Sequence, residues 1–324
     1  MRVQWAAEIV RARAFVWAAS REMKRIAKTD PWPSSYDLCS VPPVHGHPGL
    51  PLQGASARGS WFLDMMYTKV LENQLEQAIE TAHGQLDIGD AAEARDILEK
   101  VLALSSEKTS PLLRAQAMGL WGVALHALEQ DDDARDMLDR AIRLLEVFPA
   151  SDGPVARILA DLLEDRAELA LSSHAHSEAQ RMLTRAIETR RRCNESIGAE
   201  TWLALSEAMQ RMGEREGALS SLDHAESAAL DEGDLESVAL SEEMRADIEL
   251  EDPSSVRQAA QGYASAEKRW RELEDSEGVI RCLLGRVRAA ERCDDEALVG
   301  ILTRELDAIG AHDLAHQIRE GDIG

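Results

Sequence analysis

The chain has 324 residues, enough for one large or two ordinary domains with a sizeable hydrophobic core. Its formal charge of -23 at pH 7 argues against a general nucleic-acid-binding protein, which needs a basic surface against the phosphate backbone. Aromatic residues make up only 4%, while Ala, Leu, Glu and Arg are abundant, a composition that favours helix over strand. Such an acidic chain should repel anionic surfaces and attract basic partners.

Residues 1–28 are predicted to form a basic amphipathic helix. Apolar residues such as Trp5, Ile9 and Val16 recur at helical spacing, and seven basic against two acidic residues give a net charge of +5. Charged residues such as Glu8 interrupt what should be the uncharged core of a secretion signal, and we expect no stable membrane insertion. Three interpretations stay open: a membrane-surface helix, a docking arm, or a half-buried helix packed on the rest of the chain.

Residues 29–60 are predicted to be a linker, because closely spaced prolines and glycines prevent regular structure. The breakers are Pro31, Pro33, Pro42, Pro43, Pro48 and Pro51, with Gly46, Gly49, Gly54 and Gly59. The abrupt change of composition near residue 60 also fits a natural start at Met65 or Met66. The composition of residues 29–60 can therefore be explained by a genuine linker or by a reading frame that starts too early.

From residue 61 onward a helical pattern repeats. A small residue lies early in the second helix of each copy, and successive markers are 40, 45, 39, 41 and 38 residues apart. The markers are Ala94, Ala134, Ala179, Ala218, Ala259 and Ala297. In most copies an apolar residue follows after four positions and a small or apolar one after seven, which places all three on one helix face. Aspartates suited to cap helices occur at Asp152, Asp234 and Asp252.

The fourth copy resembles a tetratricopeptide repeat. It reads Trp202-Leu-Ala-Leu-Ser-Glu-Ala-Met209, then Met212-Gly213, and then Ala218 and Leu222 on the second helix. The resemblance implies an all-α fold: a right-handed superhelical solenoid of about six helix pairs over residues 61–310, with 311–324 as a capping helix and tail. The copies depart from the family in being nearer 40 than 34 residues long, and the last two are degenerate.

The same resemblance implies a binding groove lined by the first helix of each pair. The groove positions carried over are His83, Gln116, His126, Asp161, Glu164, Glu168, Glu200, Glu207, Gln210 and Glu251. The middle of this groove would be acidic and would favour a basic protein or peptide. Ordinary solvated carboxylates in an acidic protein are the competing explanation.

The predicted function is therefore a cytoplasmic, non-catalytic scaffold or adaptor that binds a peptide or helix in this acidic groove. The alternative is a ligand- or peptide-responsive regulatory module acting with a separately encoded kinase, transcription factor or protease. Residues 1–28 could occupy the groove within the same chain, since a tether raises the effective concentration to about millimolar. Self-association into a homo-oligomer is a further possibility.

We expect no catalytic residue, no metal site and no cofactor. His312 and His316 share a helical face, but a metalloprotease motif needs a glutamate after the first histidine and a third ligand. The pairs His45/His47 and His174/His176 are interpreted as loop residues. The four cysteines, which form no CxxC pair, are interpreted as reduced structural thiols: Cys39, Cys193, Cys282 and Cys293.

Two charged runs allow more than one interpretation. Asp131–Asp133 should complement the dipole at a helix start, because a calcium loop would need alternating ligands and a glycine turn. Arg190–Arg192 could grip a phosphate or an acidic partner, or could complement the dipole at a helix end.

Overall fold

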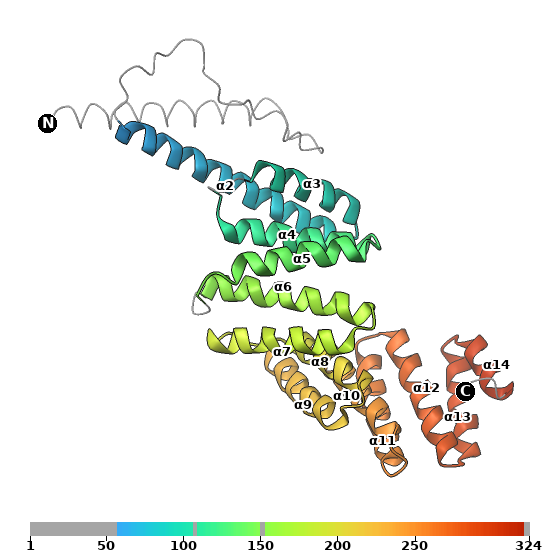
Figure 1. Ribbon diagram of the computed structural model, residues 1–324. Coiled ribbons are helices and arrows are strands. Elements are labelled where there is room, and N and C mark those ends of the chain that lie inside the picture. The colour runs from blue at the N-terminus through green and yellow to red at the C-terminus, as the bar shows by residue number, and fades with distance from the viewer. Residues whose placement is uncertain (1–56, 106–108, 150–152, 321–324) are drawn as a thin grey trace. The chain divides into compact units, whose positions relative to one another are not determined.

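The computed structural model describes residues 57–105, 109–149 and 153–320, with side chains from residue 68 onward. The predicted basic helix at 1–28 and most of the predicted linker at 29–60 lie outside these ranges, as do His45, His47, Cys39, Asp152 and the tail from residue 321. Regular structure in the described ranges consists of thirteen α-helices, so the all-α prediction is confirmed (Figure 1). The handedness of the solenoid stays a prediction.

The helices alternate with short turns along the whole described chain. They are α2 (Ala57–Asp87), α3 (Ala91–Leu104), α4 (Pro111–Ala127), α5 (Asp131–Leu145), α6 (Gly153–Ser172), α7 (His176–Arg192), α8 (Ala199–Arg211), α9 (Arg215–Glu232), α10 (Leu235–Leu250), α11 (Val256–Glu272), α12 (Ser276–Arg292), α13 (Glu296–Ala308) and α14 (His312–Glu320). Two compact units divide at residue 113. In the first, α2 packs on α3; in the second, each helix packs on the next along the chain, as with α6 on α7 and α8 on α9 (Figure 1).

The predicted markers are the points where paired helices approach closely. The first five, Ala94, Ala134, Ala179, Ala218 and Ala259, all have 0% exposure. The backbone explains the need for small residues: a Cβ added at Gly122 on α4 would come within 3.3 Å of the carbonyl oxygen of Ala134 on α5. On α8, Ser206 donates a hydrogen bond of 3.0 Å to the carbonyl of Ala218 on α9.

The sixth marker was placed wrongly, because Ala297 is exposed. Helix α13 starts after Asp295, whose side chain accepts a hydrogen bond from the amide of Leu298 at 3.0 Å. Each earlier marker lies four residues after its N-cap, which in α13 is the position of Val299. Thr303 and Leu306, four and seven residues after Val299, are buried. The small-residue position of this copy therefore lies at Val299, two residues after Ala297.

The turns within pairs share one geometry, although their residues differ. The residue before each second-helix N-cap has positive φ in most copies: 82° at Gly89, 61° at Glu129, 58° at His174, 77° at Gly213 and 55° at Asp294. The next amide then bonds the carbonyl five residues back, as Asp90 does to Gln85 at 2.8 Å. This is the left-handed C-terminal cap that glycine favours, here often built without glycine.

Of the two predicted capping aspartates in the described ranges, Asp234 is a helix cap and Asp252 is not. Asp234 caps α10, accepting from the amides of Glu236 and Ser237 at 3.1 and 3.2 Å. Asp252 instead organises the turn before α11 by accepting from the amide of Ser254 at 2.9 Å, and the N-cap itself is Ser255.

Candidate protein-interaction face

The first helices of successive pairs in the second unit pack side by side. Four contacts join α4 to α6, α6 to α8, α8 to the end of α10, and α10 to α12. They are Gly119 against Leu162, Thr201 donating to Glu164 at 2.9 Å, Gln210 donating to Glu251 at 3.4 Å, and Arg281 donating to Glu243 at 2.7 Å. We call the solvent-accessible side chains that α6, α8, α10 and α12 carry in this layer the first-helix face.

Three of the predicted groove residues lie apart from this face. His83 belongs to the first unit, is exposed, and lies 3.6 Å from Asp87. On α4, Gln116 is half-buried, while the Nδ1 of His126 lies 2.7 Å from Asp131 at the adjoining turn. His126 is therefore engaged locally.

Two predicted acidic residues are bridged within the chain. Arg190, near the end of α7, binds Asp161 at 2.6 Å and Glu164 at 2.8 Å, and it lies 3.9 Å from Glu195. Glu164 also accepts from Thr201 of the next first helix. Arg190 thus holds α6 and α7 together, and the middle of the predicted groove is less negative than the sequence suggested.

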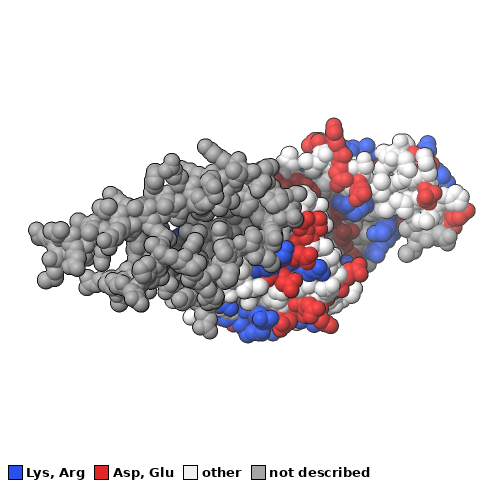
Figure 2. All heavy atoms as spheres, turned by 90° about the horizontal axis from the view of Figure 1, so that it is seen from above, with Lys and Arg blue, Asp and Glu red and all other residues white. Residues whose placement is uncertain are grey.

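The remaining predicted carboxylates are more accessible. Glu168, Glu200 and Glu251 are exposed, and Glu207 makes only a 3.8 Å pair with Arg211 one helical turn away. Figure 2 shows acidic and basic side chains interspersed over the described part of the surface in view. Because Arg190 neutralises Asp161 and Glu164, the first-helix face carries local acidic clusters and not one continuous acidic surface.

Asp165 is a functional candidate that the sequence reasoning missed. Its half-buried side chain follows Asp161 by four residues and precedes Glu168 by three, so all three share one face of α6. Burial, as the largest cause, and the negative charges of Asp161, Glu168 and Glu164 together raise the pKa of Asp165 to about 8. The i, i+4, i+7 spacing in the sequence was the signal that could have found it.

Three arginines on α12 were also missed. Arg281, Arg288 and Arg292 are exposed and follow each other at seven and four residues, which places them on one helix face. Arg281 forms a bidentate pair with Glu243 at 2.7 and 3.2 Å, while Arg292 donates to the backbone carbonyl of Leu250 at the end of α10. The face therefore ends in positive charge at α12.

A buried polar cluster fixes α10, α11 and α12 together. Glu243 is only 7% exposed; besides Arg281, it accepts a 3.0 Å hydrogen bond from the indole of Trp270. Next to it, Tyr263 donates to Asp247 at 2.5 Å. Burial is the largest cause of the raised pKa values of both Asp247 and Tyr263. These groups have partners inside the chain and hold the helices in place.

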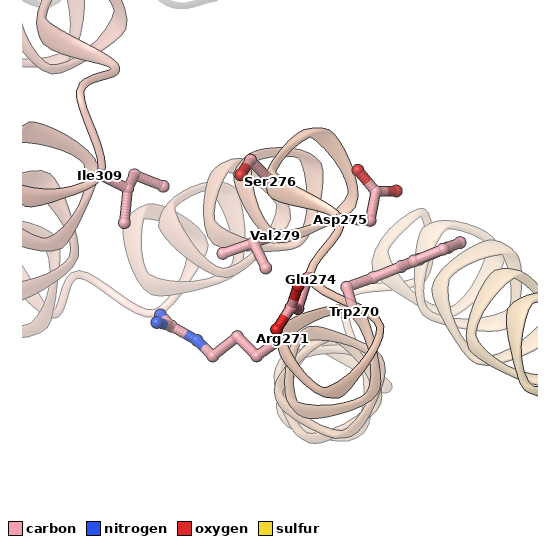
Figure 3. A pocket seen from close by; sticks show the side chains of 7 residues that line it. All are labelled: Trp270, Arg271, Glu274, Asp275, Ser276, Val279 and Ile309. Carbon is pink, nitrogen blue, oxygen red and sulfur yellow. The ribbon is translucent and has the colours of Figure 1, made fainter.

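A cavity of about 400 Å³ opens between the α11–α12 turn and the turn before α14. Figure 3 shows Ile309 on one side and Trp270 on the other, with Val279 between them. Its Arg271 is engaged by Glu267 at 2.7 Å and lies 3.7 Å from Glu305, so its charge is balanced within the chain. The cavity is a gap in packing with an apolar floor and offers little to hold a charged ligand.

No group of three or more His, Cys, Asp or Glu able to hold a metal occurs among the described residues. His312 and His316 lie 3.3 Å from Asp307 and 3.4 Å from Glu320 respectively, and the rings of His174 and His176 are 5.9 Å apart. Cys193 is half-buried, Cys282 and Cys293 are free thiols, and burial raises the pKa of Cys282.

Within the described ranges, no helix combines the length and apolar character that crossing a membrane requires.

The comparisons with known proteins concern the fold. No protein-family model and no curated protein sequence matches the chain. Among solved structures, it is similar to a Signal Transduction ATPase with Numerous Domains (STAND) protein with a tetratricopeptide repeat sensor from Pyrococcus horikoshii. That match has a TM-score of 0.63 and 14% identity, and it covers 77% of this chain but only 38% of that protein.

Two further similar structures are almost entirely covered by the match. PilF of Pseudomonas aeruginosa has a TM-score of 0.56 and 15% identity, with 78% of this chain and 99% of that one covered. A putative kinesin light chain with nearly identical TPR-like repeats from Podospora anserina has a TM-score of 0.51 and 15% identity, with 63% and 98% covered. The chain therefore has a tetratricopeptide-like helical repeat fold, which confirms the resemblance drawn from its sequence.

Proposed function

We propose that the chain is a non-catalytic scaffold or adaptor whose first-helix face binds a peptide or helix of a partner protein. The observation that carries this proposal is the group of accessible carboxyl groups on the neighbouring helices α6 and α8. Glu168 projects from α6, and Glu200 and Glu207 project from α8. Arg211 is the one ion-pair partner of these three within the described residues, and it makes the long 3.8 Å pair with Glu207.

The chemistry of this surface favours a basic partner. Neighbouring like charges on a low-dielectric surface add their potentials and steer a cationic ligand. An exposed ion pair contributes only about 0.2–1 kcal/mol, so binding needs several such pairs together with apolar contacts. Half-buried apolar side chains are available beside the carboxyl groups, at Ala204 on α8 and Met244 on α10. We therefore expect an affinity that falls as salt is added.

The test is a capture experiment with charge-reversed variants of the full chain. Glu200→Lys with Glu207→Lys changes the net charge of the first-helix face by four. Asp231→Lys with Glu232→Lys makes the same change at exposed positions on the second helix α9 and is the matched control. A partner captured by the wild type and the control but lost by the face variant supports the proposal. Equal capture by all three would rule out this surface as the binding site.

A second candidate function is a ligand- or peptide-responsive regulatory module that acts with a separately encoded kinase, transcription factor or protease. The fold shared with the tetratricopeptide repeat sensor of the STAND protein favours it. This candidate requires a conformational response, whereas a scaffold requires only binding. Comparing small-angle scattering of the chain with and without its captured partner separates the two.

We further propose that residues 1–28 compete for the acidic part of the face. Their net charge of +5 is complementary to it. Deleting residues 1–60 should then strengthen binding of a basic peptide, and an unchanged affinity would exclude the competition. Self-association through the helix faces, as a homo-oligomer, would appear as a concentration-dependent mass in the same samples.

A further inference from the structure

The charge on the first-helix face changes sign along the stack of helices. Its acidic end consists of Glu168, Glu200 and Glu207 on α6 and α8. Its basic end consists of Arg288 and Arg292 on α12, where both side chains are exposed. Arg292 donates to the backbone carbonyl of Leu250 at the end of α10, and Arg288, one helical turn earlier, shares that side of α12.

On the helix between these ends, two carboxylates are neutralised by arginines of neighbouring helices. On α10, Glu242 is paired with Arg269 at 3.0 Å and Glu243 with Arg281 at 2.7 Å. The half-buried side chains of Leu240 and Met244 lie on the same helix and pack against the core beneath α8 and α10. The middle of the face therefore combines paired carboxylates with half-buried apolar side chains, while Glu251 at the end of α10 stays exposed.

Resting on the proposed function, we infer that the first-helix face selects a charge-segregated partner segment. Such a segment carries a basic cluster that meets α6 and α8, apolar residues over α10, and an acidic cluster that meets Arg288 and Arg292. A uniformly basic segment would place like charges against α12 and lose affinity there. A segment bound in the reverse direction would oppose like charges at both ends, so the pattern also fixes the orientation.

The spacing of the two clusters follows from helix packing. Packed helices are about 8–10 Å apart, so α12 lies two steps, about 16–20 Å, from α8 and three steps, about 24–30 Å, from α6. An extended peptide advances about 3.3 Å per residue, which separates the two clusters by about five to nine residues. A partner helix, which rises about 1.5 Å per residue, would need about 11 to 20 residues.

The experiment is a selection of random 20-residue peptides displayed on phage against the immobilised full chain. It is repeated with the variant Arg288→Glu combined with Arg292→Gln, in which glutamine can still donate to the carbonyl of Leu250. A control variant, Arg143→Glu combined with Arg257→Gln, makes the same change of charge at exposed positions on the second helices α5 and α11. Circular dichroism verifies that all three proteins are folded.

We expect the wild type and the control to enrich peptides with separated basic and acidic clusters. The α12 variant should keep the basic cluster and lose the acidic one. The affinity of a synthetic peptide from the wild-type selection should fall at least fivefold on the α12 variant alone. Enrichment of basic peptides without an acidic cluster, identical for all three proteins, would overturn this inference and leave the proposed function standing. A failure of every protein to enrich any peptide would overturn both.

Discussion

Replacing Asp165 by asparagine should stabilise the protein at alkaline pH. The carboxyl is half-buried on α6, and its pKa is raised to about 8 by burial and by the charges of Asp161, Glu168 and Glu164. The folded state therefore favours the protonated form. Ionising the group costs stability that accumulates as the pH rises from about 4 to about 8. Asparagine has nearly the same shape and cannot ionise, so it removes this cost.

The structure sets an upper limit on the effect. A pKa unit is worth about 1.4 kcal/mol, so a rise from 3.8 to about 8 corresponds to at most about 6 kcal/mol at pH 9. The side chain is still partly accessible to water, and surface charges interact as if in a medium of high dielectric constant. We therefore expect a gain of about 2 kcal/mol at pH 9 that shrinks toward zero at pH 4.

The assay is urea unfolding followed by circular dichroism at pH 4.5, 7 and 9. Asp132→Asn is the matched control, because the side chain of Asp132 is 99% exposed on α5. The control should change the free energy of unfolding by less than about 0.5 kcal/mol at each pH. If the variant at position 165 is less stable than the wild type at pH 9, or if its effect does not depend on pH, the cost of ionising Asp165 is not as described.

Three other substitutions probe the packing that holds the face. Gly285→Ala should destabilise the chain by about 1–3 kcal/mol, because the new Cβ would come within 2.4 Å of the ring of Tyr263. Glu243→Ala should lower the free energy of unfolding by about 2 kcal/mol, because it leaves Arg281 without its ion-pair partner. The loss should be smaller than for a fully buried ion pair, since the side chain of Arg281 is 46% exposed. His174→Gly should stabilise by about 0.5–1 kcal/mol, because φ is 58° there and glycine adopts this conformation without strain.

Melting temperatures and urea midpoints measure all three, and each has its own control. For the packing clash, Gly300→Ala is suitable, since a Cβ there meets no atom within 4 Å. For the buried carboxylate, Glu243→Gln should recover part of the loss by keeping an acceptor for Trp270. For the turn, Gly213→Ala should destabilise the chain, because φ is 77° at Gly213 and alanine is strained in this left-handed conformation. A destabilised His174→Gly variant would show that the left-handed turn carries no strain.

The repeat pattern was predictable because the requirement for small residues is strict. Five of the six markers, such as Ala94 and Ala218, are completely buried where two helices touch. The sixth was misplaced because α13 is set by its cap at Asp295, and a chance alanine two residues before the true position satisfied the pattern. Left-handed turns at Glu129 and His174 could not be predicted, because the tertiary packing imposes there a conformation that their own preference disfavours.

The binding surface was less predictable than the fold. Helix spacing identified the exposed carboxylates, but it could not show that Arg190 from a second helix neutralises Asp161 and Glu164. Such cross-helix pairs depend on which long side chains meet in space. The arginines of α12 were missed because the degenerate fifth and sixth copies hid the register that brings Arg281 and Arg292 into contact with α10.

Binding of a partner to the first-helix face can be followed by hydrogen exchange, measured by mass spectrometry on the full chain with and without the captured partner. The partner should slow exchange in α6, α8, α10 and α12 and leave the second helices α7, α9 and α11 unchanged. Slowed exchange confined to the second helices would show that the partner does not bind this face.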